Sequence, residues 1–251
     1  MPAKAGRNSN NYAMMNEELA LQFNKEAEGL SIPETIRMLC NRLSGPVVFS
    51  TSFSYEDQVV TDIIFTADLP VSLFTLDTGR HFEETYKVMN RTREHYGKDI
   101  LTMFPDREQV ENLLSEKGPY SFYESIENRK ECCHIRKVLP LRRALAGASC
   151  WITGLRAGQS ETRQNLEKLQ YDPSNNLIKY HPLLDWTLDL VKDYVKENHI
   201  PYNLLHDKDY PSIGCAPCTR AIGPDEPFRA GRWWWENNSS KECGLHPSEE
   251  K

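Results

Sequence analysis

The strongest constraint on the fold is an alternation of short apolar runs with amphipathic segments between residues 47 and 153. Apolar runs predict four buried strands, at residues 47–52, 71–76, 100–104 and 149–153. Apolar residues at helical spacing predict helices at 56–65 and 82–96, and a third through Val138, Leu141 and Leu145. Strands that alternate with helices predict an α/β fold, with a mostly parallel sheet covered by helices on both faces.

The flanking segments complete this outline. Ser31 and Glu34 form a capping-box pattern that predicts a helix start, and Gly45-Pro46 predicts its end. A further amphipathic helix is predicted at 187–198. From Asp209 onward the periodicity is lost, so this part reads as an extension of the same domain. We expect three parts: an N-terminal segment (1–30) that is partly disordered, an α/β domain (31–236) and a mobile tail (237–251).

Bulk composition excludes several classes. The 251 residues carry a net charge of −6, which argues against a broad nucleic-acid face but leaves room for a small anion in a local cationic pocket. The chain has no apolar run near the roughly 20 residues of a membrane helix. Its first dozen residues lack the apolar centre of a secretory signal. We therefore expect a cytoplasmic protein without membrane contact, and the sequence leaves open whether it forms a homo-oligomer.

Ligands of parallel α/β sheets bind beyond the carboxyl ends of the strands, so the loops at 52–57, 77–81 and 154–163 are the candidate binding loops. The hydroxyl-rich run from Ser50 to Ser54 leads into a helix, where free backbone amides bind phosphate. The run does not match a Walker A loop, and an ordinary capped helix start explains it equally well.

Glycines and arginines follow two of the predicted strands. Gly allows close approach of the backbone to a ligand, and Arg binds phosphate or sulfate through two parallel hydrogen bonds. Each arginine alone is more often a surface residue, but their concentration at one end of the sheet predicts an anion site. The candidates are Asp77, Gly79, Arg80, Arg156, Arg163, Arg229 and Arg232.

Four of the seven cysteines form two close pairs, Cys132-Cys133 and Cys215-x-x-Cys218. Four thiolates from two chain segments suit Zn²⁺ or an iron–sulfur cluster. Adjacent side chains on a helix diverge by about 100°, which favours a larger cluster without excluding zinc. Lys137 lies four residues after Cys133, where its charge would offset an anionic cluster.

The tail carries Cys243, in the run Glu242-Cys243-Gly244-Leu245-His246. A cysteine this close to a terminus is rarely packed in a core, and an exposed thiol is either reactive or incidental. The preceding Trp233-Trp234-Trp235 is more typical of an anchor for the base of the tail than of a base-stacking platform.

These motifs together resemble the cluster-bearing assimilatory adenylyl-sulfate reductases, over residues 46–246. The resemblance rests on the two cysteine pairs, on the run 229–236, on Leu76 to Arg80, on Ile152 to Arg156 and on the tail. It implies an adenine-nucleotide α-hydrolase-like fold. It also implies reduction of adenosine 5′-phosphosulfate (APS) to sulfite and AMP in sulfate assimilation, with thioredoxin as electron donor. A [4Fe–4S] cluster would then be held by Cys132, Cys133, Cys215 and Cys218.

In such an enzyme Cys243 is the nucleophile that attacks the sulfate sulfur, and AMP leaves. The arginines and Lys137 would screen the negative charge, and His246 would lower the thiol pKa or donate a proton. If four cysteines are ligands, only Cys40 and Cys150 remain, both in apolar contexts. The electrons should therefore come from an external dithiol.

One departure concerns the first loop, where the family carries a glycine before Glu-Asp and this chain does not. Ser52 and Asp57 are still expected to bind substrate. The alternatives are the phosphorylated substrate PAPS, an ATP-dependent adenylating enzyme on the same fold, and a non-catalytic nucleotide sensor that holds a metal or a cluster.

Overall fold

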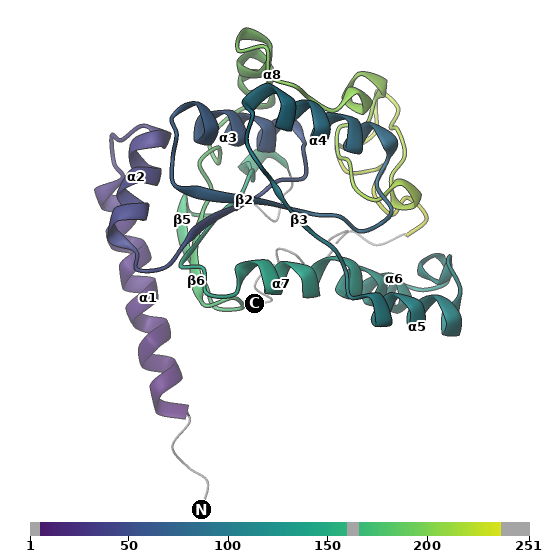
Figure 1. Cartoon of the computed structure of the whole chain (residues 1–251), viewed down its shortest axis with the longest axis horizontal. Coiled ribbons are helices and arrows are strands. Elements are labelled where there is room, and N and C mark those ends of the chain that lie inside the picture. Colours follow the sequence, from purple (N-terminus) through teal and green to yellow (C-terminus); the bar gives the residue numbers. More distant parts are fainter. Residues whose placement is uncertain (1–5, 160–165, 237–251) are drawn as a thin grey trace, which may run out of the picture. The chain divides into compact units, whose positions relative to one another are not determined.

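The computed structural model describes residues 6–159 and 166–236, with side chains from Asn16 onward (Figure 1). The chain forms two compact units. The first comprises Met1–Thr51, Glu56–Leu73 and Leu145–Asn198, and the second comprises Ser52–Tyr55, Phe74–Ala144 and His199–Lys251. Strand β2 (Val71–Leu76) is divided between the two units.

The first unit contains β1 (Val47–Ser50), β4 (Cys150–Ile152), β6 (Leu177–Tyr180) and β5 (Leu169–Asp172). β4 pairs in parallel with β1 and with β6, and β5 pairs with β6 in the antiparallel sense. The short apolar strands β1 and β4 are buried, with Phe49 and Ile152 fully enclosed, as expected for strands of a parallel sheet covered on both faces.

Four helices belong to this unit: α1 (Gly6–Glu26), α2 (Ile32–Arg42), α3 (Tyr55–Thr66, from Glu56 onward) and α8 (Leu188–Glu197). The capping box at Ser31 and Glu34 is confirmed at the start of α2. The sequence analysis does not predict α1. Its Asn24 side chain exchanges hydrogen bonds with the backbone N–H (3.1 Å) and C=O (2.6 Å) of Leu169, so the helix covers the free edge of β5.

The second unit contains the end of β2, paired in parallel with β3 (Leu101–Met103), and the helices α4 (Glu83–Tyr96), α5 (Arg107–Lys117), α6 (Ile126–Cys133) and α7 (Leu139–Leu145, up to Ala144). One turn of π-helix, His134–Val138, joins α6 to α7. Residues 199–236 have little regular structure, apart from 3₁₀ turns at Leu204–Lys208 and Ala216–Cys218.

Along the sheet the six strands follow the order β3-β2-β1-β4-β6-β5, with β5 as the antiparallel edge. The predicted α/β class with a mostly parallel sheet is therefore confirmed. The predicted strand at 47–52 ends earlier, at Ser50, because the chain then turns through Phe53, a buried residue in the left-handed region (φ 60°).

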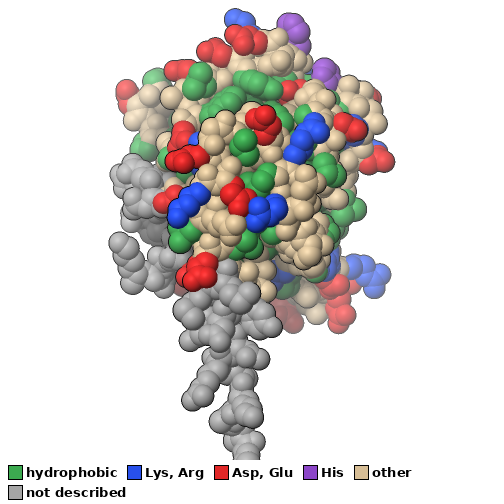
Figure 2. Space-filling model, turned by 90° about the vertical axis from the view of Figure 1, so that its left-hand side faces the viewer, with side chains coloured by type: hydrophobic (Ala, Val, Ile, Leu, Met, Phe, Trp, Pro, Cys, Tyr) green, Lys and Arg blue, Asp and Glu red, His purple; other side chains and the backbone are tan. Residues whose placement is uncertain are grey.

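The surface of the described residues mixes both signs of charge. Figure 2 shows acidic and basic side chains interspersed with apolar ones over the face that it presents. Among the described residues, Arg42 forms an ion pair with Glu26 at 2.7 Å. Within the described residues, none of the helices combines the length and the hydrophobicity that a membrane span requires.

Candidate functional site

The two cysteine pairs line one cavity in the second unit. Cys132 and Cys215 are 83 positions apart in the sequence, so the fold brings them together. All four are buried free thiols. The other residues that line the cavity are mostly cationic or aromatic: Arg80, Phe122, Arg129, Arg136, Lys137 and Trp233. The structure thus brings together the four predicted cysteine ligands and Lys137.

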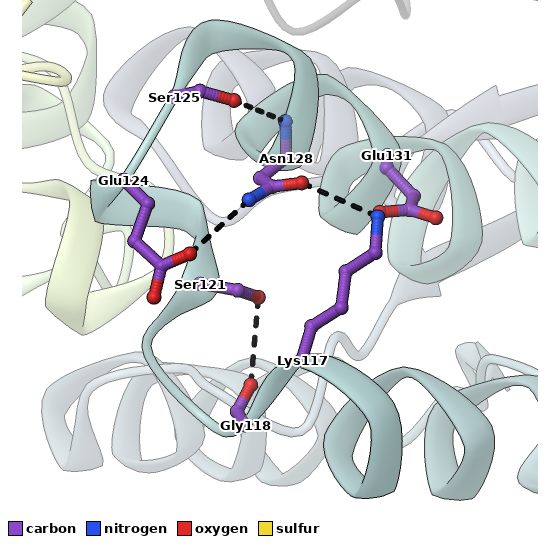
Figure 3. A network of polar contacts seen from close by, with 7 residues as sticks. All are labelled: Lys117, Gly118, Ser121, Glu124, Ser125, Asn128 and Glu131. Carbon is purple, nitrogen blue, oxygen red and sulfur yellow. Dashed lines mark hydrogen bonds and ion pairs between the residues drawn. The ribbon is translucent and has the colours of Figure 1, made fainter.

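Helix α6 presents the first pair, Cys132 and Cys133, on its last turn. Its N-terminus is capped by Ser125, whose Oγ accepts from the backbone N–H of Asn128 (3.1 Å). Lys117, the last residue of α5, donates to Glu131 Oε2 (2.6 Å) and to Asn128 Oδ1 (3.3 Å). Figure 3 shows this network, which holds α6 by both its first and its last turn.

The π-turn that follows Cys133 carries Arg136 and Lys137 to the cavity. Its defining bond runs from the N–H of Leu139 to the carbonyl of His134, five residues back. Arg136 is buried, and its Nη1 donates to the carbonyl of Thr78 (2.7 Å). π-turns of this kind are rare and are concentrated at functional sites.

The second pair lies in a loop held by the segment after β2. Ala216 N–H donates to the carbonyl of Arg80 (2.8 Å), and Tyr123 OH donates to the carbonyl of Pro217 (2.6 Å). Thr78 Oγ1 lies 3.2 Å from Cys215 Sγ. Thr78 is a site residue that sequence analysis missed, although it stands inside the motif Leu76 to Arg80.

Burial and nearby cations act in opposite directions on three of the four thiols. Burial, together with the neighbouring Cys215, raises the pKa of Cys218 to about 12. Burial also raises the pKa of Cys132. Burial opposes ionisation of Cys215 as well, but Lys137, the Thr78 hydroxyl and Arg232 hold its pKa below the usual value. Cys132 and Cys218 therefore need a bound cation to become thiolates at neutral pH.

Buried N–H donors also fit an anionic group with sulfur acceptors in the cavity. Arg136 Nε and Trp233 Nε1 belong to residues that line it, and neither finds an acceptor among the described residues. Leaving buried donors unpaired is costly, so a thiolate-bound cluster that accepts from them fits the site. In the part of the chain that the structure describes, three or more His, Cys, Asp or Glu side chains do not converge as they would on one metal ion.

The loop after β2 is built around Asp77. Its Oδ1 accepts from the N–H of Gly79 (2.8 Å) and from Tyr86 OH (3.0 Å), and Gly79 takes a φ of 69° that favours glycine. Arg80 then extends across the Phe122 ring, 4.8 Å from its centre, and donates through Nη2 to the carbonyl of Pro119 (2.7 Å).

In the first unit, the loop after β4 packs on the first turn of α3. A Cβ atom at Gly154 would overlap Oδ1 of Asp57 and would lie 3.2 Å from the Asp57 backbone nitrogen, so a larger residue here displaces this carboxylate. Arg156 Nε donates to Glu56 Oε1 (2.8 Å), and both side chains are almost fully buried. Glu56 is a second residue that sequence analysis missed, and it is bonded to the guanidinium of Arg156.

Three other predicted residues belong to the second unit. Ser52 is exposed, and its Oγ bonds Ser54 Oγ (3.3 Å). Arg232 is buried and donates to Ser212 Oγ and to the carbonyl of Ile213, both at 3.3 Å. Arg229 is half-buried. The predicted residues Arg163, Cys243 and His246 lie outside the described residues.

Four buried cysteines that line one cavity, on an α/β fold with a mostly parallel sheet, define the class of protein. Residues 46–221 match the phosphoadenosine phosphosulfate reductase domain. The chain belongs to this family.

Relatives agree with this assignment. An adenosine 5′-phosphosulfate reductase of Agrobacterium fabrum is 50% identical over 81% of this chain and 78% of its own length. A protein of the same name from Allochromatium vinosum is 47% identical over 86% of this chain and 84% of its own.

Solved structures support the fold. The crystal structure of a phosphoadenylyl-sulfate reductase from Candida auris, in complex with phosphate, matches with a TM-score of 0.69 at 29% identity, over 82% of this chain and 97% of that one. The yeast FAD synthetase matches with a TM-score of 0.53 at 15% identity, over 84% of this chain and 75% of that one, and shows the fold alone.

Proposed function

We propose that this chain reduces APS to sulfite and AMP. The observation that carries the proposal is the cavity lined by four free cysteines and by the cationic side chains of Arg80, Arg129, Arg136 and Lys137. The names of the relatives support APS as the substrate, because those at 44–51% identity are called adenosine 5′-phosphosulfate reductases.

The proposed cofactor is a [4Fe–4S] cluster held by Cys132, Cys133, Cys215 and Cys218. The buried thiols, the cations around them and the unpaired N–H donors of Arg136 and Trp233 support it. When bound, the cluster supplies fixed charge beside the sulfate. Lys137 and Arg80 line the same cavity and offset the negative charge of the thiolates.

In the proposed reaction the thiolate of Cys243 attacks the sulfur of the sulfate group. A sulfur–sulfur bond forms, the bond from sulfur to the phosphate oxygen breaks, and AMP leaves with that electron pair. A thiol of an external dithiol then attacks the sulfur of Cys243 and expels sulfite. The second thiol of the donor releases Cys243, so the donor becomes a disulfide and supplies two electrons.

The remaining proposed roles concern charge and position. Arg156, Arg163, Arg229 and Arg232 are proposed to bind the phosphosulfate, together with Ser52, Asp57, Asp77 and Gly79. His246 is proposed to assist Cys243 as a proton donor. Thioredoxin in the cytoplasm is the proposed donor, since a dithiol of that class suits the exchange. The proposed organisation keeps residues 31–236 as the reductase domain and 237–251 as a mobile catalytic tail.

Purified enzyme with thioredoxin and a regenerating system tests the proposal, with APS and PAPS supplied in parallel and sulfite measured. We expect sulfite from APS, and a much lower kcat/KM with PAPS. Cys243→Ser should abolish sulfite release and leave the visible absorbance of the cluster unchanged. Sulfite release by Cys243→Ser at the wild-type rate would contradict the mechanism.

A further inference from the structure

Arg129 is a buried cation that has no role in the proposed reaction. It lies on α6, one turn before Cys133, and only 1% of the residue is exposed. It lines the cysteine cavity and hydrogen-bonds the side chain of Cys133. An arginine at this position therefore faces one of the proposed ligands directly.

The same guanidinium forms a buried two-point ion pair with Glu236. Arg129 Nε donates to Glu236 Oε1 (2.7 Å) and Nη2 donates to Oε2 (3.0 Å), and the carboxylate side chain is only 4% exposed. A planar guanidinium that makes two parallel bonds fixes both distance and orientation. Movement of one partner is therefore transmitted to the other.

Trp233 connects the pair to the second cysteine pair. The guanidinium of Arg129 lies 4.6 Å from the centre of the Trp233 ring, and the backbone N–H of Trp233 donates to the carbonyl of Cys218 (3.1 Å). Glu236 N–H donates in turn to the carbonyl of Trp233 (2.9 Å). The segment 233–236 is thus attached to both halves of the cavity.

We propose that Arg129 is a positioning residue that couples the cysteine-lined site to Glu236, the residue from which the C-terminal tail departs. Arg129 divides its bonds between Cys133 and Glu236, so a filled site orders both, and loss of the iron loosens 233–236. Coupling of this kind is reciprocal: what frees Glu236 also weakens iron binding. The inference rests on the proposed cluster.

The position of Glu236 gives the coupling a consequence for the reaction. Cys243 is the seventh residue after Glu236, so an anchored Glu236 limits its reach to about 25 Å of extended chain. Release of 233–236 lengthens this tether and lowers the effective concentration of the thiol at the substrate. Enzyme without iron would then deliver its nucleophile poorly.

Hydrogen exchange measured by mass spectrometry tests the coupling, with wild-type enzyme before and after removal of iron by a chelator. The reporters are the amides of Arg232, Trp233 and Glu236, which are all hydrogen-bonded. Iron removal should speed their exchange by about 5- to 150-fold, the range of typical coupling energies. Peptides from β4 in the first unit serve as the internal control and should not change.

Two variants and a matched control complete the test. The double variant Arg129→Met/Glu236→Leu removes both charges without leaving either one unpaired, a change that buried pairs often tolerate. Exchange at 232–236 should then be the same with and without iron, and iron should dissociate faster. Glu226→Gln disrupts a similar two-point pair with Arg220 (2.7 and 2.6 Å) that is about 40% exposed, and it should behave like wild type.

The outcomes separate the two proposals. Purified protein without iron or a visible chromophore refutes the cluster, and the coupling with it. If wild-type enzyme is purified with iron, but hydrogen exchange at residues 232–236 does not change when the iron is removed, the coupling alone is refuted. A double variant that keeps the wild-type response refutes the role of Arg129. If the double variant does not fold, Glu236→Gln replaces it, and a full wild-type response in that variant refutes the role equally.

Discussion

The buried ion pair between Arg156 and Glu56 yields a prediction that the structure makes quantitative. Arg156 Nε and Glu56 Oε1 are 2.8 Å apart, with side-chain exposures of 4% and 6%. At an effective dielectric constant of about 20, their attraction is about 6 kcal/mol before desolvation is subtracted. Glu56→Ala leaves Arg156 buried without its carboxylate, which typically costs about 3–5 kcal/mol.

Thermal and urea unfolding of Glu56→Ala measure this loss. For a chain of this size the expected fall in Tm is about 6–20 °C. Glu26→Ala, which removes the partly exposed partner of Arg42, is the control and should cost about 0–1 kcal/mol. The double variant Glu56→Leu/Arg156→Met should recover most of the stability. It should still raise the KM for APS, because Arg156 is proposed to bind the substrate.

A Glu56→Ala variant that is no less stable than Glu26→Ala would refute this reasoning. It would mean that burial of the Arg156 guanidinium does not require its ion pair with Glu56 in solution. The loop after β4 would then need another explanation for its position.

Three further predictions follow from other described residues. Gly154→Ala should lower APS turnover by at least about tenfold, because its Cβ meets the Asp57 carboxylate. Gly223→Ala is the control, because its Cβ makes only an ordinary contact with Glu226 Oε2 (3.8 Å). Cys215→Ser should abolish iron and sulfide content, whereas Cys40→Ser should retain both. Burial opposes ionisation of Asp172, but Lys179 holds its pKa below the ordinary 3.8, so its stabilising effect is present above pH 3.8 and is lost as the pH falls below it. Asp172→Asn should therefore flatten the acid side of the stability profile measured by urea unfolding, and an unchanged profile would contradict this.

Local signals account for the part of the fold that the sequence predicts. The capping box at Ser31, the buried strands and the amphipathic α4 and α8 each depend on residues within about one element of one another. Helix α6 is not predicted by such signals, because its sequence, IENRKECC, is polar and has no apolar stripe. β5 (LQYD) and β6 (LIKY) are not predicted, because Gln170, Asp172 and Lys179 interrupt the apolar runs that mark β1 and β4.

The candidate site, like the fold, is predicted only in part from the sequence. Spacing along the chain identifies the two cysteine pairs, and the structure adds that they share a cavity. The partners Arg156–Glu56 and Arg129–Glu236 are separated by 100 and 107 residues, so only the folded chain brings each pair together. The π-turn after Cys133 likewise depends on tertiary packing, because its residues HIRKV are compatible with an ordinary α-helix.

Cys243 is proposed to take the sulfonate group from APS and to hold it until the donor thiol expels it as sulfite. Enzyme incubated with APS and no reductant, then digested and analysed by mass spectrometry, tests it directly. The account predicts that the peptide containing Cys243 gains the mass of one SO₃ group and loses it when thioredoxin is added. An unmodified Cys243 peptide, in enzyme that releases sulfite once the reductant is supplied, would contradict the account.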